Sequence, residues 1–513
     1  MTEATGINTV PEIVWNDDEI LRPGMDFKEG VVYVTIPAII NETVTVGRGK
    51  SERQQIKPVH GLACVTSDRR QFPFNQENVA TLGFSYPPHV MVPLDRRWSS
   101  TGIRVFLGQR ENPIAPAVLH DGLRSIYEEY IEFANENYYD VMPLFIMGSY
   151  LFRLYKSLGY IHFNGSAASG KSQNLRILDA LAFNTAWASS MSSAALYRSL
   201  AGNPGTVCID EAEGWEGERG EELRRILNAG YLDGSTVKRA EKGQNDQFIV
   251  ASFESYGPKA IASINPLDAV IGSRCLIVAM RPAIRIIREF DKDDPRWQTL
   301  RDRLYIWMMT HGPAVARRIE AWNETIRFDR CPTLVGRQWQ ITQMYLTLAD
   351  YIDSFDHGTR CAKLIAFFIE YFDSLQRQQD AGDRIRLLLR VLPEVLRTKT
   401  AFDGGWYHIK TVHEIMATYI EEDAKEYYKT RSVSKHLEVL SFKKRRASKQ
   451  GQQVWLDADQ IRQEFRQRRV EPVEEDKQWF LGEIEYVPAD DEPVPPAGQS
   501  DNLWAGLVQE EEE

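Results

Sequence analysis

One eight-residue loop constrains the fold of this 513-residue chain more than any other feature of its sequence. The loop fits the pattern Gly-x4-Gly-Lys-Ser and consists of Gly165, Ser166, Ala167, Ala168, Ser169, Gly170, Lys171 and Ser172. The run YIHFN precedes it and SQNLRILDALA follows it, which predicts a strand, a phosphate-binding loop (P-loop) and a helix. Lys171 would reach the β- and γ-phosphates, and the Ser172 hydroxyl would bind Mg²⁺. The alternative is a Gly/Ser-rich loop that binds nothing.

A second strand-like run, GTVCIDE at residues 205–211, ends in two carboxylates. Asp210 follows Lys171 by 39 residues, which leaves room for a helix, a strand and another helix. This spacing suits a Walker B strand next to the P-loop strand. Asp210 would then hold Mg²⁺ through its water shell, and Glu211 would polarise the attacking water. Strands often end in acidic residues, so a purely structural role is the alternative.

The patterns along the rest of the chain predict an α/β fold. Short apolar runs alternate with helical patterns around the two motifs, which indicates a mostly parallel sheet in a P-loop NTPase core. A β-rich N-terminal domain, a helical lid and a C-terminal winged-helix-like domain are expected around this core. The expected segments are 1–112 (β-rich), 113–158 (helical linker), 159–290 (NTPase core), 291–400 (lid), 401–470 (winged-helix-like) and 471–513 (disordered acidic tail).

Charge and composition exclude some classes of protein. The net charge is −11, but residues 471–513 alone carry −13, so residues 1–470 are near neutral and nucleic acid remains a candidate partner. The five cysteines are scattered without a CxxC pair, which disfavours a disulfide framework or a cysteine zinc site. No apolar run is long enough for a membrane span and no signal-peptide pattern is present. We expect a cytoplasmic protein of a bacterium, an archaeon or a phage-infected cell, with no membrane partner.

The sequence resembles the AAA+ ATPases of phages, plasmids and integrated elements, which are helicase-like replication proteins of the superfamily 3 type and are often found beside primase-polymerase modules. Besides the two motifs, the resemblance rests on LRRILNAGY, GSTVKR and GPKAIASINPLDAVIGSRCLIVAMR, at residues 223–231, 234–239 and 257–281. It implies that the chain binds ATP and Mg²⁺ and forms a homo-hexamer.

The resemblance also implies roles for single residues. Asn265 would be sensor 1, near the γ-phosphate, although it could simply start a turn before Pro266. Arg274 would be an arginine finger on the neighbouring subunit's nucleotide; a structural ion pair is the alternative, and Arg281 is a rival for the finger. Arg337, in the helical lid, would be sensor 2 on the nucleotide.

Two segments are candidates for nucleic-acid binding. Two β-prone runs flank EKGQND and predict a hairpin, which in the resembling helicases points into the central pore. Its basic residues Lys238, Arg239 and Lys242 would hold the DNA backbone, unless the hairpin is merely solvated. The winged-helix-like segment has a net charge of +8 over residues 429–470. Its candidates lie on a helix (Lys435, His436) and on a wing (Lys443, Lys444, Arg445, Arg446, Lys449).

Alternatives remain for the C-terminal segments. The winged-helix-like unit could serve only protein contacts, and Asp457 or Asp459 would be a helix N-cap. In the tail, Leu503 and Trp504 could dock on a partner, or the tail could be only a solvated extension.

Together these features predict an ATP-hydrolysing, DNA-translocating motor, a replicative DNA helicase of a mobile genetic element. Its expected partners are single-stranded DNA in a central pore and a primase or polymerase. The main alternative is an ATP-regulated replication initiator or regulator that binds DNA without unwinding it. A third class is a nucleotide-gated defence or partitioning scaffold.

Overall fold

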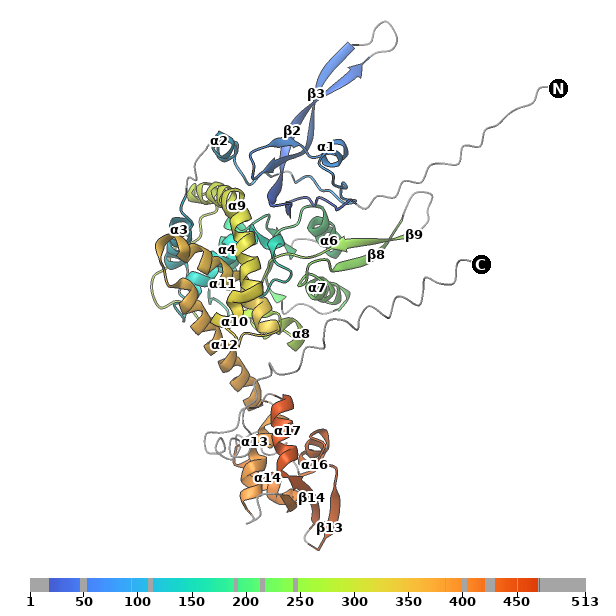
Figure 1. Cartoon of the computed structure of the whole chain (residues 1–513), viewed down its shortest axis with the longest axis vertical. Helices are drawn as coiled ribbons and strands as arrows, with labels where there is room; N and C mark the ends of the chain where they lie inside the picture. Colours follow the sequence, from blue (N-terminus) through green and yellow to red (C-terminus); the bar gives the residue numbers. More distant parts are fainter. Residues whose placement is uncertain are drawn as a thin grey trace, which may run out of the picture. The chain divides into compact units, whose positions relative to one another are not determined.

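The structure, a computed structural model, divides into two compact units, Met1–Tyr371 and Phe372–Glu513 (Figure 1). It describes residues 18–46, 53–93, 95–108, 114–188, 192–212, 217–242, 248–382, 384–398, 404–419, 430–449, 451–468 and 470. The expected acidic tail, with Leu503 and Trp504, lies outside these residues. In the described part of the chain, no helix combines the length and apolar character needed to cross a membrane.

An antiparallel sheet of four strands begins the first unit, and the expected β-rich N-terminal region is confirmed. The strands follow the order β1-β2-β3-β4 and span Met25–Lys28, Val31–Val46, Arg53–Thr66 and Gln71–Pro73. Two helices, α1 (Gln76–Thr81) and α2 (Ser100–Gly108), follow the sheet. Tyr33, Leu62 and Phe84 belong to its buried core. Beyond this core β2 and β3 stay paired as a long arm (Figure 1).

Five parallel strands form the central sheet, in the order β11-β5-β10-β7-β6. Their bounds are Tyr160–Gly165 (β5), Ala186–Trp187 (β6), Val207–Ile209 (β7), Lys259–Ser263 (β10) and Cys275–Met280 (β11). The connecting helices are α5 (Lys171–Leu181), α6 (Ser193–Gly202), α7 (Gly217–Ala229) and α8 (Ala269–Gly272). β7 and β10 are buried throughout, as a sheet covered on both faces requires. The prediction of an α/β fold with a parallel sheet is confirmed.

The predicted hairpin lies between β7 and β10 in the chain and is a separate two-stranded sheet. It consists of β8 (Thr236–Lys242) and β9 (Phe248–Glu254). Glu254, at its base, accepts hydrogen bonds from Arg153 Nη1 at 2.8 Å, Arg153 Nη2 at 3.1 Å and Arg22 Nε at 3.0 Å. Because Arg22 lies three residues before β1, this ion-pair cluster ties the hairpin base to the N-terminal sheet.

Long helices complete the first unit. They are α3 (Pro116–Tyr130), α4 (Tyr138–Ser149), α9 (Arg296–Ala321), α10 (Arg327–Arg330), α11 (Arg337–Asp356) and the part of α12 (Arg360–Gly382) that ends at Tyr371, where the first unit ends. α4 is buried on all sides, and α11 packs against α3, α4 and α9. A short 3₁₀ helix (Phe152–Leu154) precedes β5, and a π-helical turn (Trp322–Ile326) ends α9.

The second unit is a small α/β domain with its own core. It contains α13 (Arg384–Arg397), β12 (Gly404–His408), α14 (Ile409–Ala417), α16 (Thr430–Val439), β13 (Arg445–Ser448), β14 (Gly451–Asp457) and α17 (Ala458–Arg468). The strands form an antiparallel sheet in the order β12-β14-β13. Asp457 Oδ1 accepts the Gln460 N–H at 3.0 Å, so Asp457 caps α17 as the sequence predicted.

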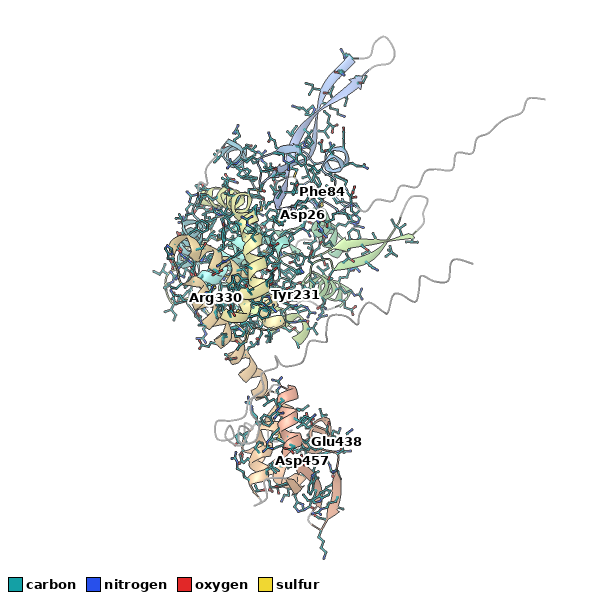
Figure 2. All side chains as sticks on the ribbon, in the orientation of Figure 1. Asp26, Phe84, Tyr231, Arg330, Glu438 and Asp457 are labelled. Atoms are coloured by element: carbon teal, nitrogen blue, oxygen red, sulfur yellow. The ribbon has the colours of Figure 1, made fainter. Side chains whose placement is uncertain are left out.

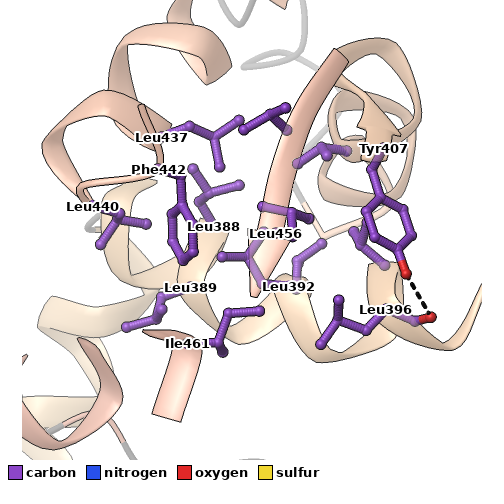
Figure 3. Packing of buried hydrophobic residues seen from close by; sticks show 14 of the residues in the cluster. Leu388, Leu389, Leu392, Leu396, Tyr407, Leu437, Leu440, Phe442, Leu456 and Ile461 are labelled. Carbon is purple, nitrogen blue, oxygen red and sulfur yellow. Dashed lines mark hydrogen bonds between the residues drawn. The ribbon is translucent and has the colours of Figure 1, made fainter. Parts of the chain in front are cut away.

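One expected boundary differs. The sequence predicts a helical lid up to residue 400, but α13 belongs to the second unit. Leu388, Leu392 and Leu396 of α13 are buried in one core with Leu437 and Leu456 (Figure 3). The apolar stripe of α13 therefore packs onto the other elements of the second unit.

Candidate functional site

The eight-residue loop connects the carboxyl end of β5 to the first turn of α5. Gly170 adopts φ +85° and Ala168 φ +58°, so the chain turns sharply before Lys171 begins the helix. A Cβ on Gly165 would lie 2.2 Å from the carbonyl oxygen of Met280, which leaves room only for glycine. The Lys171 ammonium donates to the carbonyls of Gly165 at 2.8 Å and Ser166 at 2.6 Å. It is therefore held over the loop.

These residues fit a nucleoside triphosphate with Mg²⁺. The N-terminus of α5 and the Lys171 ammonium supply positive charge at one place. The Ser169 hydroxyl is buried and lacks a hydrogen-bond partner among the described residues, so the loop contains a polar group that can still form a hydrogen bond. Ser172 is exposed at the start of α5 and offers the hard oxygen ligand that Mg²⁺ prefers.

The Walker B residues lie at the same edge of the sheet. β7 and β5 both pair with β10, so their carboxyl ends are about 10 Å apart with one strand between them. Asp210 and Glu211 directly follow β7, and the Glu211 N–H donates to Asp210 Oδ1 at 3.1 Å. Glu211 is exposed and adopts φ +55°, a conformation rare for residues other than glycine.

The sensor 1 candidate follows the central strand. β10 ends at Ser263, two residues before Asn265, where the sequence predicted the strand end. Asn265 is exposed, and its carbonyl accepts the Ser263 hydroxyl at 2.6 Å. The Asn164 amide donates to the Ile264 carbonyl at 3.0 Å, and His162 Nε2 lies 2.6 Å from Ser263 Oγ. Burial lowers the pKa of His162 to about 4, which keeps its ring neutral.

Sequence reasoning missed this polar ladder from His162 to Asn265. The signal for it is a histidine and an asparagine inside the otherwise apolar strand before the loop.

Arg274 lies at the opposite, amino edge of the sheet. It directly precedes β11, and its carbonyl accepts the Tyr160 N–H at 2.9 Å. β11 and β5 run in parallel from Cys275 opposite Tyr160 to Met280 opposite Gly165. Arg274 is thus about 17 Å from its own P-loop. Its guanidinium lies 5.7 Å from the ring centre of Tyr231 and bonds the carbonyl of Val270.

Arg337 is beside Arg274 and not beside the P-loop. Its guanidinium lies 5.5 Å from the same Tyr231 ring (labelled in Figure 2), and Nη1 donates to Ser273 Oγ at 2.9 Å. Burial raises the pKa of Tyr231 to about 12 against the opposing effect of the two arginines. The sensor 2 interpretation, which needs Arg337 on the nucleotide of its own subunit, is not supported by this position.

Arg281, the rival for the finger, is at the P-loop edge. It follows Met280, the last residue of β11, which pairs with Gly165. Arg281 is exposed there. The two rival arginines are therefore at opposite ends of one strand.

The basic residues of the hairpin have different surroundings. Lys238 is exposed. Arg239 pairs with Glu222 of α7 and lies 5.2 Å from the ring centre of Tyr197, with its side chain only 17% exposed. These contacts hold Arg239 against the protein, and its predicted DNA contact stays a prediction. The Lys242 side chain lies outside the described residues.

Sequence reasoning missed an apolar group on β9. Phe248, Ile249 and Val250 are 74%, 52% and 72% exposed, respectively.

Two of the four principal wing residues also face the protein. Arg445 donates to the carbonyls of Phe442 and Ser434, the latter at 3.3 Å, and burial lowers its pKa. Arg446 Nε donates to Gln453 Oε1 at 2.6 Å, and its guanidinium lies 4.5 Å from the Trp406 ring centre. The predicted nucleic-acid contact by the four wing residues stays a prediction. Lys435, Lys443 and Lys444 are exposed.

Three comparisons relate the chain to known proteins. No protein-family model matches the sequence, and no curated protein matches it. Among solved structures, a full-length MCM homolog from Methanopyrus kandleri is similar at TM-score 0.32 and 14% identity, covering 66% of this chain and 77% of that chain. The SCCmec type IV Cch active helicase is similar at TM-score 0.33 and 10% identity, covering 88% and 95%. Drosophila ORC bound to DNA is similar at TM-score 0.19 and 10% identity, covering 74% and 96%. Similarities this low carry no argument about residues or activity.

Proposed function

We propose that this chain is an ATP-dependent, DNA-translocating motor, the replicative DNA helicase of a mobile genetic element. It would bind ATP and Mg²⁺ and work as a homo-hexamer around single-stranded DNA. Its resemblance to the AAA+ ATPases of such elements and the strand order of its parallel sheet support this proposal.

The observation that carries the proposal is the division of the motif residues between the two edges of one sheet. The loop 165–172, Asp210 and Glu211 are at the carboxyl edge, whereas Arg274 is at the amino edge. Across about 17 Å, Arg274 cannot reach phosphates on its own loop. A guanidinium for hydrolysis would come from a second copy in a head-to-tail contact, and repetition of that contact closes a ring.

In the proposed reaction each residue has one task. The loop N–H groups and Lys171 hold the phosphates, while Ser172 and Asp210 hold Mg²⁺, which neutralises phosphate charge when bound. Glu211 polarises the attacking water. Arg274 of the next subunit stabilises the charge that develops on the transferred phosphoryl group. Asn265 and Arg281, at the same edge as the loop, are the further candidates for contact with the γ-phosphate.

The hairpin is the proposed DNA contact of the motor. Lys238 supplies positive charge for the backbone, and exposed Phe248 supplies an aromatic face on which a base of a single strand stacks. Arg239 is left out because Glu222 and Tyr197 already hold it.

Unwinding of a forked duplex by the purified protein tests the proposal. We expect unwinding with ATP, none with a non-hydrolysable analogue, and none with Lys171→Ala. DNA binding and ATP hydrolysis without unwinding would replace the helicase with an ATP-regulated initiator. Hydrolysis without any DNA binding would leave a nucleotide-gated scaffold.

A further inference from the structure

A cleft of about 650 Å³ lies within the second unit, between the starts of two helices. Its walls are the first residues of α14, one face of α16 and the start of β14. On α16 the lining residues Arg431, Ser434, Lys435 and Glu438 recur at helical spacing, so they share one face. The cleft is remote in sequence from the P-loop and shares no residue with it.

The cleft is electropositive. Lys410, Arg431 and Lys435 line it, and Glu438 (labelled in Figure 2) is the single carboxylate among its described lining residues. Lys410 pairs with Glu414 at 3.3 Å, but that pair is exposed and therefore weak. Both α14 and α16 begin at the cleft, and the positive ends of two helix dipoles add to the three cations.

Neutral donors complete the set. The hydroxyls of Thr430 and Ser434 line the same walls, as does the backbone at Gly451. His408 precedes α14 without capping it through its side chain. Its Nδ1 is buried and has no hydrogen-bond partner among the described residues. Three cations and two hydroxyl-bearing residues favour a ligand with several anionic oxygens.

We infer that this cleft binds the phosphodiester backbone of duplex nucleic acid and that it, and not the wing, is the nucleic-acid contact of the second unit. On the wing, Arg445 and Arg446 are engaged with Phe442, Ser434, Gln453 and Trp406, which leaves three exposed lysines, whereas the cleft adds concave walls and two helix N-termini to its three cations. Lys410 and Arg431 are the residues that this site adds. Backbone binding needs no base contact, so the grip is independent of sequence and sensitive to salt.

Two triple variants of the full chain with equal charge loss test the inference. One is Lys410→Gln/Arg431→Gln/Lys435→Gln in the cleft, and its matched control is Lys443→Gln/Lys444→Gln/Lys449→Gln on the wing. Binding of a fluorescent duplex is measured without nucleotide over a salt series. The cleft variant should lose about tenfold or more in affinity, and its log–log salt slope should fall by about 2 to 3, whereas the wing variant should change much less. Equal losses in both variants, or a loss in the wing variant alone, would overturn the inference.

A variant that binds duplex more tightly would show that the losses in the cleft variant are not caused by misfolding. Glu438→Gln removes the opposing carboxylate, so duplex binding should tighten several-fold, which a damaged fold cannot imitate. Unchanged or weaker binding by this variant contradicts the site. A cleft of this kind could bind either a free phosphate ion or the phosphates of a nucleic-acid backbone. Binding measured with inorganic phosphate, compared with chloride at equal ionic strength, distinguishes the two. Saturable binding of the free ion in the cleft without duplex binding would overturn the assignment to a backbone. Because no nucleotide is present, a failure of the proposed motor leaves these results unaffected.

Discussion

Arg274 and Arg281 are only seven residues apart, yet strand β11 separates them and places them at opposite edges of the sheet. Arg281 follows the strand beside Gly165, whereas Arg274 precedes it beside Tyr160. The two arginines therefore differ in the nucleotide that each can reach. In the proposed motor, Arg281 would therefore act on the nucleotide of its own subunit, and Arg274 on that of a second copy.

Mixing of inactive subunits distinguishes these two positions. Arg274→Ala should bind ATP almost normally but turn over about 10³-fold more slowly. Mixed with Lys171→Ala, it should regain ATPase activity, because some interfaces then combine an intact loop with an intact finger. Arg281→Ala mixed with Lys171→Ala should regain nothing, since both defects affect the same subunit's site. Recovery in the second mixture alone would exchange the roles of the two arginines.

Lys171 carries the most specific single prediction. Lys171→Ala should lower ATP turnover by about 10²-fold or more, because the loop loses its ammonium at the β- and γ-phosphates. Lys238→Ala removes the same charge from the exposed hairpin and serves as the control in a DNA-free ATPase assay. Normal turnover in Lys171→Ala would refute the P-loop interpretation.

At the scale of elements, ion pairs at the base of the β8–β9 hairpin hold it to the rest of the first unit. Glu254 ends β9 and accepts three hydrogen bonds from Arg153 and Arg22 while only 19% of its side chain is exposed. Burial raises the pKa of Glu254, but the two arginines outweigh it and leave the pKa below the ordinary value. The carboxylate is therefore charged and paired, and it links the hairpin to the N-terminal sheet.

Glu254→Gln should lower the free energy of unfolding of the first unit by about 3 kcal/mol, because the buried Arg153 and the partly exposed Arg22 both lose the carboxylate that pairs with them. Glu221→Gln is the control, since its pair with Arg225 is 3.6 Å long and exposed, and it should cost less than about 0.5 kcal/mol. Denaturant unfolding measures both. The folded carboxylate has the lower pKa, so its contribution is present at neutral pH and is lost as the pH falls below the ordinary value of 4.5. A gap between wild type and Glu254→Gln that persists in acid would contradict this pairing.

Local patterns predicted the elements better than the directions of side chains. The P-loop, the β7 strand, the hairpin and the Asp457 cap each follow from a short run of residue types, because backbone conformation is largely local. The inward positions of Arg239 and Arg445 could not be predicted in this way. The sequence pattern of a basic residue on a strand is the same whether its side chain faces solvent or a neighbouring glutamate or carbonyl. The position of Arg337 beside Tyr231 does not follow from the local sequence either, because only the packing of α11 brings it there.

At the scale of the whole molecule, the sequence-based prediction and the structure differ in where the first unit ends. The helical lid expected over residues 291–400 gives no sign that α13 belongs to a different core from the helices before it. The decisive contacts are distant in sequence: Leu388 and Leu392 pack with Leu437 and Leu456, and the Tyr407 hydroxyl donates to the Leu396 carbonyl at 3.1 Å (Figure 3). Such pairings depend on tertiary structure and are not encoded in the local period.

Two truncations test this division. A chain ending at residue 382 keeps the first unit and removes α13 with its partners, so it should stay monodisperse and retain DNA-free ATPase activity. A chain ending at residue 400 keeps α13 but removes its core, which exposes the apolar stripe that includes Leu388, Leu392 and Leu396. That chain should aggregate or bind a hydrophobic dye strongly. Size-exclusion chromatography with light scattering compares the two. Equal behaviour of both chains would mean that α13 does not need the second unit, and the boundary predicted at residue 400 would then be the better one.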